Sequence, residues 1–60
     1  MSLTEKERMA LDESLASEKL LIKKCRVMAE ECRDGELKAL CNQLADKHQQ
    51  HFNILIGYLQ

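Results

Sequence analysis

The chain has 60 residues, enough for one small domain, and a chain this short buries too little surface to be comfortably stable without a metal, a crosslink or self-association. Nine basic and ten acidic residues are interspersed and give a net charge of −1, which argues against nucleic acid or an anionic membrane as a partner. The absence of Pro, with only two Gly, indicates an all-α chain.

A first helix is predicted to begin at Thr4. Thr4 and Glu7, three residues later, form the sequence pattern of a capping box, in which each side chain satisfies a free backbone N–H of the other residue. Mostly apolar residues then recur at alternating steps of four and three, the heptad spacing of closely packed helices, and we call such a row of residues a stripe. This predicts a helix over about residues 4–33. Its stripe contains Leu11, Leu15, Glu18, Ile22, Cys25, Ala29 and Cys32.

A turn is predicted at residues 34–35, where Gly35 relieves the steric cost of the turn and Asp34 caps the next helix. The second helix is expected over about residues 36–58, and it carries the same heptad spacing. The two helices therefore belong to a single domain spanning residues 1–60. The second stripe contains Leu37, Cys41, Leu44, His48, His51, Leu55 and Tyr58.

Folding the chain back at this turn places the two stripes against each other, with Glu18 opposite His51 and Ile22 opposite His48. Every stripe residue then meets another stripe residue, so the predicted fold is an antiparallel two-helix hairpin. Further apolar residues flank both stripes, and one partner helix cannot cover them all. We therefore expect two hairpins to form a homodimeric four-helix bundle, or a higher oligomer. The flanking residues are Leu20, Leu21, Val27, Met28, Leu40, Phe52, Ile56 and Leu59.

Glu18, His48 and His51 occupy stripe positions where apolar side chains are expected. A carboxylate opposite two imidazoles suits a polar layer that fixes helix register, with Glu18 neutralised by His51 or a neighbouring lysine. It also suits a metal site with these three residues as ligands, and an imidazole-rich site favours zinc, nickel, copper, or a single iron or manganese ion. A third alternative is that Glu18 extends to solvent.

No catalytic machinery can be assembled from the sequence: it lacks a Ser/His/Asp set, a Gly-rich phosphate loop and paired catalytic carboxylates. Cys25, Cys32 and Cys41 are expected to be reduced packing residues, with soft-metal or redox chemistry as the alternative.

No apolar stretch is long enough to cross a membrane, and no signal-peptide pattern follows the N-terminus, so we expect a cytoplasmic protein. The predicted function is that of a non-enzymatic structural protein that binds itself, with metal binding as the alternative.

Three motifs resemble the coat F domain, a ferritin-like family of spore coat proteins in endospore-forming bacteria. They are Leu3-Thr4-Glu5-Lys6, Leu15-Ala16-Ser17-Glu18-Lys19 and His48-Gln49-Gln50-His51. The resemblance covers residues 3–59 and implies half of a ferritin-like bundle, a place in the spore coat and other coat proteins as partners.

Metal-binding ferritin-like proteins use a Glu from one helix and a Glu-x-x-His from the next. Glu18 and His51 match this pattern, but His48 stands where the second acid is expected. A symmetric dimer would present two Glu and four His, which is too few bridging carboxylates for an oxygen-activating di-iron centre. The resemblance thus implies a site for a different ion, such as zinc or a single iron or manganese.

Overall fold

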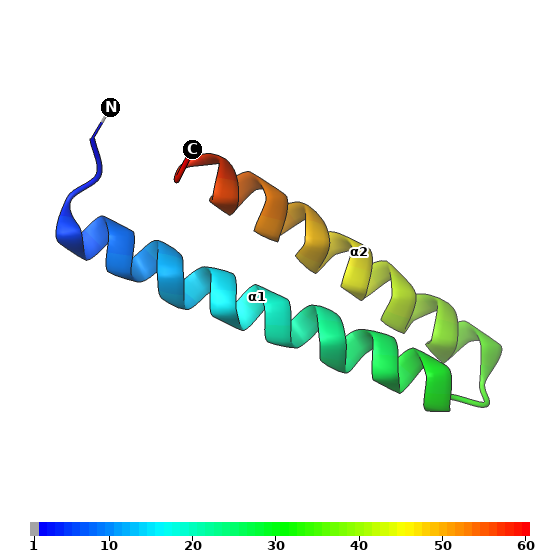
Figure 1. Ribbon diagram of the computed structural model, residues 1–60. Helices are drawn as coiled ribbons and strands as arrows, with labels where there is room; N and C mark the ends of the chain where they lie inside the picture. Colours follow the sequence, from blue (N-terminus) through cyan, green and yellow to red (C-terminus); the bar gives the residue numbers. More distant parts are fainter. Residues whose placement is uncertain (1) are drawn as a thin grey trace.

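The structure is a computed structural model that describes residues 2–60. Helix α1 spans Glu5–Glu31 and helix α2 spans Gly35–Gly57, and the two run antiparallel side by side, with the turn at one end and both chain termini at the other (Figure 1). No strand occurs in residues 2–60, so the predicted all-α hairpin is confirmed. Its extents of 46 × 14 × 12 Å describe a rod only two helices wide.

The start of α1 is stabilised by the predicted capping box. Thr4 Oγ1 accepts a hydrogen bond from the Glu7 backbone N–H at 3.1 Å, and the Glu7 carboxylate accepts one from the Thr4 backbone N–H at 2.8 Å. The hydrogen bond from the Thr4 backbone N–H, and to a lesser extent the Thr4 hydroxyl, favour the ionised carboxylate and therefore hold the pKa of Glu7 below its ordinary value. The motif fixes the first turn of α1 as the sequence predicts.

The turn lies closer to α1 than predicted and spans residues 32–34 instead of 34–35. Cys32 leaves the helical conformation with φ −69° and ψ 133°, so α1 ends at Glu31 rather than near residue 33. The Asp34 carboxylate accepts a hydrogen bond from the Leu37 N–H at 2.8 Å, which confirms its capping role. Gly35 is already the first residue of α2 and has no positive φ, so its predicted role in relieving turn strain is wrong.

The stripe predicted for α1 forms the contact with α2. All seven of its members are buried or half-buried, and Ala29 is 3% exposed. Neither α1 nor α2 has the length and apolarity needed to cross a membrane.

The inward face of α2 is rotated slightly from the prediction, so that Ala45, Phe52 and Leu59 face inward in place of Leu44, His51 and Tyr58. Leu37, Leu44, His51 and Tyr58 are exposed, so four of the seven predicted members do not lie fully between the helices. The physical reason is the small side chain of Ala45, which is completely buried and allows the helices to approach closely. The observed inward stripe is Cys41, Ala45, His48, Phe52, Leu55 and Leu59.

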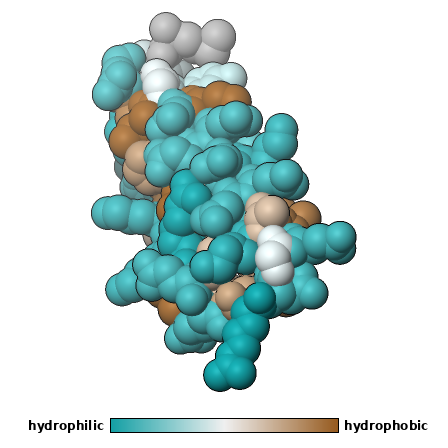
Figure 2. All heavy atoms as spheres, turned by 90° about the vertical axis from the view of Figure 1, so that its right-hand side faces the viewer, coloured by the Kyte–Doolittle hydropathy of each residue, from teal (hydrophilic) through white to brown (hydrophobic). Residues whose placement is uncertain are grey.

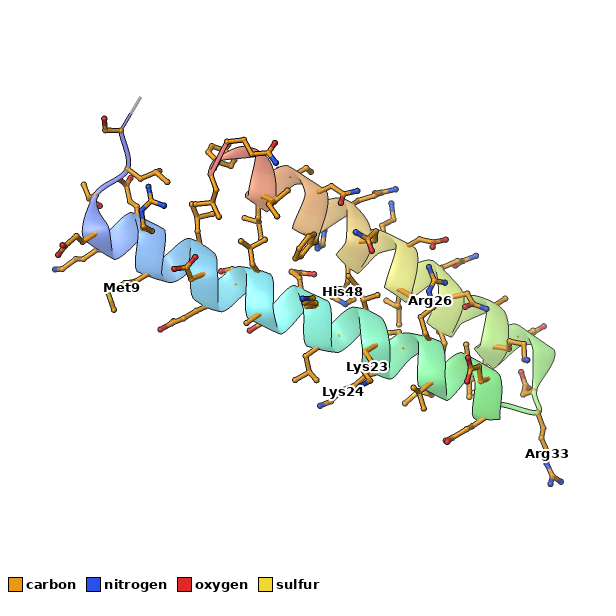
Figure 3. All side chains as sticks on the ribbon, in the orientation of Figure 1. Met9, Lys23, Lys24, Arg26, Arg33 and His48 are labelled. Carbon is orange, nitrogen blue, oxygen red and sulfur yellow. The ribbon has the colours of Figure 1, made fainter. Side chains whose placement is uncertain are left out.

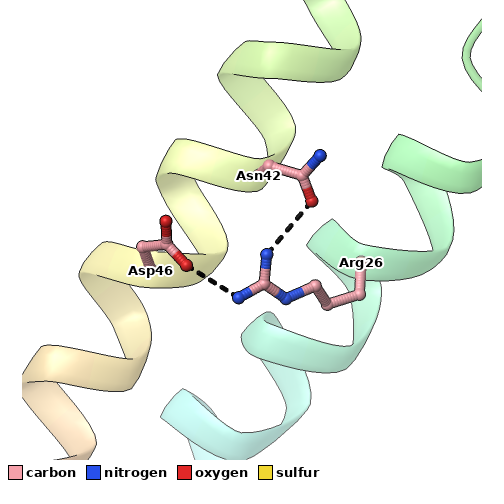
Figure 4. A network of polar contacts seen from close by, with 3 residues as sticks. All are labelled: Arg26, Asn42 and Asp46. Atoms are coloured by element: carbon pink, nitrogen blue, oxygen red, sulfur yellow. Dashed lines mark hydrogen bonds and ion pairs between the residues drawn. The ribbon is translucent and has the colours of Figure 1, made fainter.

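One edge of the contact between the helices is polar. The Arg26 guanidinium reaches from α1 to α2 and donates hydrogen bonds to Asn42 Oδ1 at 3.0 Å and to Asp46 Oδ1 at 2.7 Å (Figure 4). Arg26 lies between the two helices on the face turned to the viewer (Figure 3). These contacts pair Arg26 with Asp46 across this edge.

The opposite edge is apolar. The positions on the two sides of the inward stripe form the two edges of the helix contact. Arg26 and Asn42 lie on one side of the stripe, and the residues on its other side form the second edge of the hairpin. We call these residues the apolar edge, and all of them are exposed. The apolar edge contains Leu21, Met28, Leu37, Leu44 and Tyr58. Seen from the turn end, hydrophobic patches break a mostly hydrophilic surface (Figure 2).

Candidate metal centre

Glu18 from α1 and His48 and His51 from α2 meet between the helices, and we call them the Glu–His cluster. His48 Nδ1 lies 2.7 Å from Glu18 Oε2, and His51 Nδ1 lies 3.4 Å from Glu18 Oε1. Each residue offers one ligand atom, and these atoms all lie within 4.8 Å of one another. Figure 3 shows His48 pointing into the space between α1 and α2. The structure therefore brings together the three residues that the sequence singled out.

The order of partners within the cluster differs from the prediction. Glu18 was expected opposite His51, and Ile22 opposite His48, but the imidazole nearest to Glu18 is that of His48. The rotation of α2 explains the difference, because it turns His48 inward and moves His51 toward the apolar edge. His51 still reaches the carboxylate because it lies one helical turn beyond His48.

Glu18 does not extend to solvent. Its side chain is 17% exposed and that of His48 is 23% exposed, whereas His51 is 54% exposed. Within the part of the chain that the structure describes, the ion-pair partners of Glu18 are the two histidines, and neither Lys19 nor Lys23 is among them. The cluster is thus closed on the side of Glu18 and open on the side of His51.

The cluster meets the requirements of a polar layer by itself. The two imidazole rings are arranged edge to face, with centroids 5.8 Å apart and planes at 83°. The Nδ1 atoms of both rings lie close to the Glu18 carboxylate. No buried side-chain nitrogen or oxygen in residues 2–60 lacks a hydrogen-bond partner. A satisfied layer of this kind specifies helix register, because a shift would leave Glu18 unpaired in an apolar contact.

The same atoms can hold a metal ion. Zinc binds His nitrogen and carboxylate oxygen at about 2.0–2.2 Å, so two ligand atoms of a tetrahedral site lie about 3.3 Å apart. The Glu18–His51 distance of 3.4 Å already has this value. The Glu18–His48 distance of 2.7 Å is that of a hydrogen bond, and an ion in place of the shared proton would lengthen it by about 0.6 Å. Three protein ligands leave a fourth position open.

The three cysteines lie outside the cluster. Cys41 is 3% exposed, and Cys25 and Cys32 are half-buried free thiols. Burial raises the pKa of the Cys41 thiol, and the neighbouring Cys32 and Cys25 raise it further. A thiol held neutral in this way is a poor nucleophile and a poor metal ligand, which agrees with the packing role expected from its place in the stripe.

Sequence reasoning missed the contact of Arg26 with Asn42 and Asp46. The signal was nevertheless present: Arg26 directly follows the stripe residue Cys25, and Asn42 directly follows Cys41. Residues at equivalent flanking positions of two antiparallel helices lie side by side, where opposite charges pair.

Comparison of the chain with models of protein families, with curated proteins and with solved structures gives no match. The resemblance to the coat F domain therefore rests on the three sequence motifs alone and stays a prediction.

Proposed function

We propose that this chain is a non-enzymatic structural protein whose hairpins associate through the apolar edge into a four-helix bundle. The observation that carries the proposal is the exposure of large apolar side chains on one edge. Leu37 is 46% exposed, Leu44 43%, Met28 54% and Tyr58 65%. By contrast, the only buried residues in the described chain are the small Ala29, Cys41 and Ala45.

Such a core is too small to account for a stable fold. A fully buried Leu or Met side chain contributes about 1.5–3 kcal/mol relative to an exposed one, so each half-exposed side chain that becomes covered adds about 1 kcal/mol. In a symmetric dimer each of these side chains is covered in both copies, so its contribution counts twice. Self-association thus supplies the apolar burial that a single hairpin lacks.

A second copy of the chain suits the apolar edge for two reasons. The five side chains of the apolar edge are uncharged, and Lys24 and Glu31, which lie beside Met28, carry opposite charges, so two copies can meet there without net repulsion. The charged residues at the contact between the helices, Arg26 and Asp46, are already paired on the opposite edge and face away. In addition, Leu40 and Ile54 extend the apolar surface around α2 and are 50% and 63% exposed.

The motifs shared with the coat F domain support a role in a spore-associated assembly. A short hairpin that repeats by self-association is a suitable building unit for a protein layer, and other coat proteins would then be its further partners. This part of the proposal depends on the resemblance and is independent of the hairpin geometry.

The test is the oligomeric state of the purified chain as a function of concentration, measured by analytical ultracentrifugation. We expect a dimer or larger species, and we expect Leu44→Gln to shift it toward monomer. Met9→Gln is the control, because Met9 is 62% exposed and lies near the start of α1, twelve residues before Leu21 and outside the apolar edge. A stably folded monomer at all concentrations would overturn the proposal.

Metal binding is the second candidate function, and the approach of three ligand atoms to within 4.8 Å favours it. Its test is elemental analysis of the untagged protein, followed by thermal unfolding with added zinc or iron. A bound ion raises the melting temperature because it binds the folded chain more tightly than the unfolded one. If no transition metal copurifies and neither ion changes the melting temperature, this function is excluded.

A further inference from the structure

We infer that the Glu–His cluster is a zinc-type site at the interface between two copies of the chain, so that the ion and the second copy bind cooperatively. The inference rests on the proposed self-association and names the ligand that regulates it. It follows from three observations: the donor set, the direction in which the cluster opens, and the place of His51 beside the apolar edge.

The donor set is two imidazole nitrogens and one carboxylate from a single chain. This combination suits zinc, which accepts nitrogen and oxygen ligands in a tetrahedral arrangement, and it is a poor choice for magnesium or calcium, which prefer oxygen. Binding needs only a small rearrangement: the proton shared by His48 and Glu18 moves to the other ring nitrogen of His48, and the freed lone pair faces the ion.

The cluster opens in one direction. Glu18 and His48 are 17% and 23% exposed, whereas His51 is 54% exposed, so solvent reaches the site past His51. The fourth coordination position of a bound ion is therefore expected on the side of His51, where water or a group from outside the hairpin can occupy it.

That side is the apolar edge. Leu44 and Tyr58 each lie seven residues from His51 along α2, so the three side chains follow one another on the same flank of the helix. A second copy that covers Leu44 and Tyr58 must also cover His51. The copy then excludes bulk water from around the site, while one bound water can remain at the fourth position, and this strengthens the attraction between the ion and the Glu18 carboxylate.

The effect is reciprocal. An ion holds the exposed His51 side chain in one conformation before the second copy arrives, so less side-chain freedom is lost on association. Linkage requires that each zinc ion bound strengthens the dimer by the same factor by which the dimer strengthens the binding of that ion. Coupling of this kind is typically worth a factor of about 5–150.

The experiment measures dimer dissociation by analytical ultracentrifugation on the full chain after chelator treatment, with and without one equivalent of zinc chloride. Zinc binding is measured in parallel by isothermal titration calorimetry. For the wild type we expect zinc to bind and to lower the dimer dissociation constant about tenfold. Magnesium chloride is the control ion and should leave the dissociation constant unchanged.

Three variants separate the two parts of the inference. His51→Ala should lose zinc binding and the effect of zinc on the dimer, while Gln50→Ala, an exposed neighbour outside the cluster, should keep both. Leu44→Gln should still bind zinc but associate more weakly. Circular dichroism confirms that each variant is helical before its data are interpreted.

The outcomes distinguish this inference from the proposed function. If the wild type dimerises but binds no zinc, or binds zinc without a change in the dissociation constant, the inference is wrong and self-association stands. If His51→Ala responds to zinc as the wild type does, the site is wrong. A chain that remains monomeric with and without zinc would contradict the proposed function as well.

Discussion

Glu18 and His48 are joined across the hairpin at 2.7 Å, in a contact between helices that is otherwise formed by apolar and small side chains. Both side chains are largely shielded from water, so each needs the other as a partner. This pair keeps His48 in the contact, because a rotation that removed His48 would leave the carboxylate with the more distant His51 alone. The register of the hairpin and the geometry of the candidate site thus depend on the same two residues.

The rotated face of α2 predicts a large effect at Ala45. Ala45→Leu should destabilise the hairpin by about 1–3 kcal/mol, because the residue is completely buried and the added atoms force the helices apart. The control is Ala39→Leu on the exposed side of α2, which should change stability by less than about 0.5 kcal/mol. The free energy of unfolding of each variant is measured in urea. Equal effects of the two substitutions would contradict the observed inward face.

This region also shows where sequence reasoning succeeds and where it stops. Heptad spacing predicts the hairpin and the whole inward stripe of α1, because there one set of residues fits the pattern. In α2 two stripes fit equally well and share Cys41, His48 and Leu55, so spacing cannot distinguish Leu44 from Ala45. The choice depends on how closely the helices approach, which is a property of both helices together.

The candidate site was predictable for the same reason. His48 belongs to both α2 stripes, and His51 lies one turn further along, so either rotation leaves two imidazoles near Glu18. The order of the two partners and the exposure of His51 were not predictable, because both depend on the rotation.

The place of Gly35 was misjudged because glycine is common in turns for its access to positive φ, whereas here Asp34 caps the helix and glycine simply follows it.

The capping box at Thr4 predicts a pH dependence of stability. The folded state holds the pKa of Glu7 below its ordinary value, so the stabilisation is fully present above the unfolded pKa and is lost as the pH falls through the folded pKa. We expect the decline on acidification to be smaller in Glu7→Gln, whose amide oxygen still accepts the Thr4 hydrogen bond but does not ionise. Urea unfolding from pH 7 to about pH 3 measures the difference. Parallel curves for the two proteins would exclude a contribution from Glu7.

Gly57 offers a stabilising substitution. It lies in the last turn of α2, has no positive φ, and a Cβ added there would meet nothing within 4 Å. Gly57→Ala should therefore raise stability by about 0.4–1 kcal/mol, because alanine loses less backbone entropy on folding. Thermal unfolding followed by circular dichroism measures the change at one fixed protein concentration. A decrease in melting temperature would indicate that the open space at Gly57 is filled in solution, as by a second copy.

The packing role of Cys41 predicts its reactivity. Cys41 is 3% exposed and its thiol pKa is raised by burial, so under native conditions it should react with iodoacetamide more slowly than the half-buried Cys25 and Cys32. Mass spectrometry of peptides after timed alkylation gives the three rates. In urea the three cysteines should react alike, which provides the control. Fast native modification of Cys41 would contradict its place between the helices.

Replacement of Glu18 distinguishes the polar layer from the metal site. In the chelator-treated protein Glu18→Leu should leave stability within about 1 kcal/mol of the wild type or raise it, because a leucine packs well in the inward stripe and the two histidines keep some access to water. Glu13→Leu at an exposed position of α1 is the control for the general effect of removing a carboxylate.

With zinc present the same substitution gives a different result if the cluster binds the ion. The wild type should gain stability with increasing zinc, as mass action requires, and Glu18→Leu should gain much less because one of three ligands is missing. Urea unfolding at several zinc concentrations measures both responses. A polar layer without metal affinity predicts instead that zinc leaves both proteins unchanged, and then the function of the Glu18–His48 pair is to fix the register of the two helices.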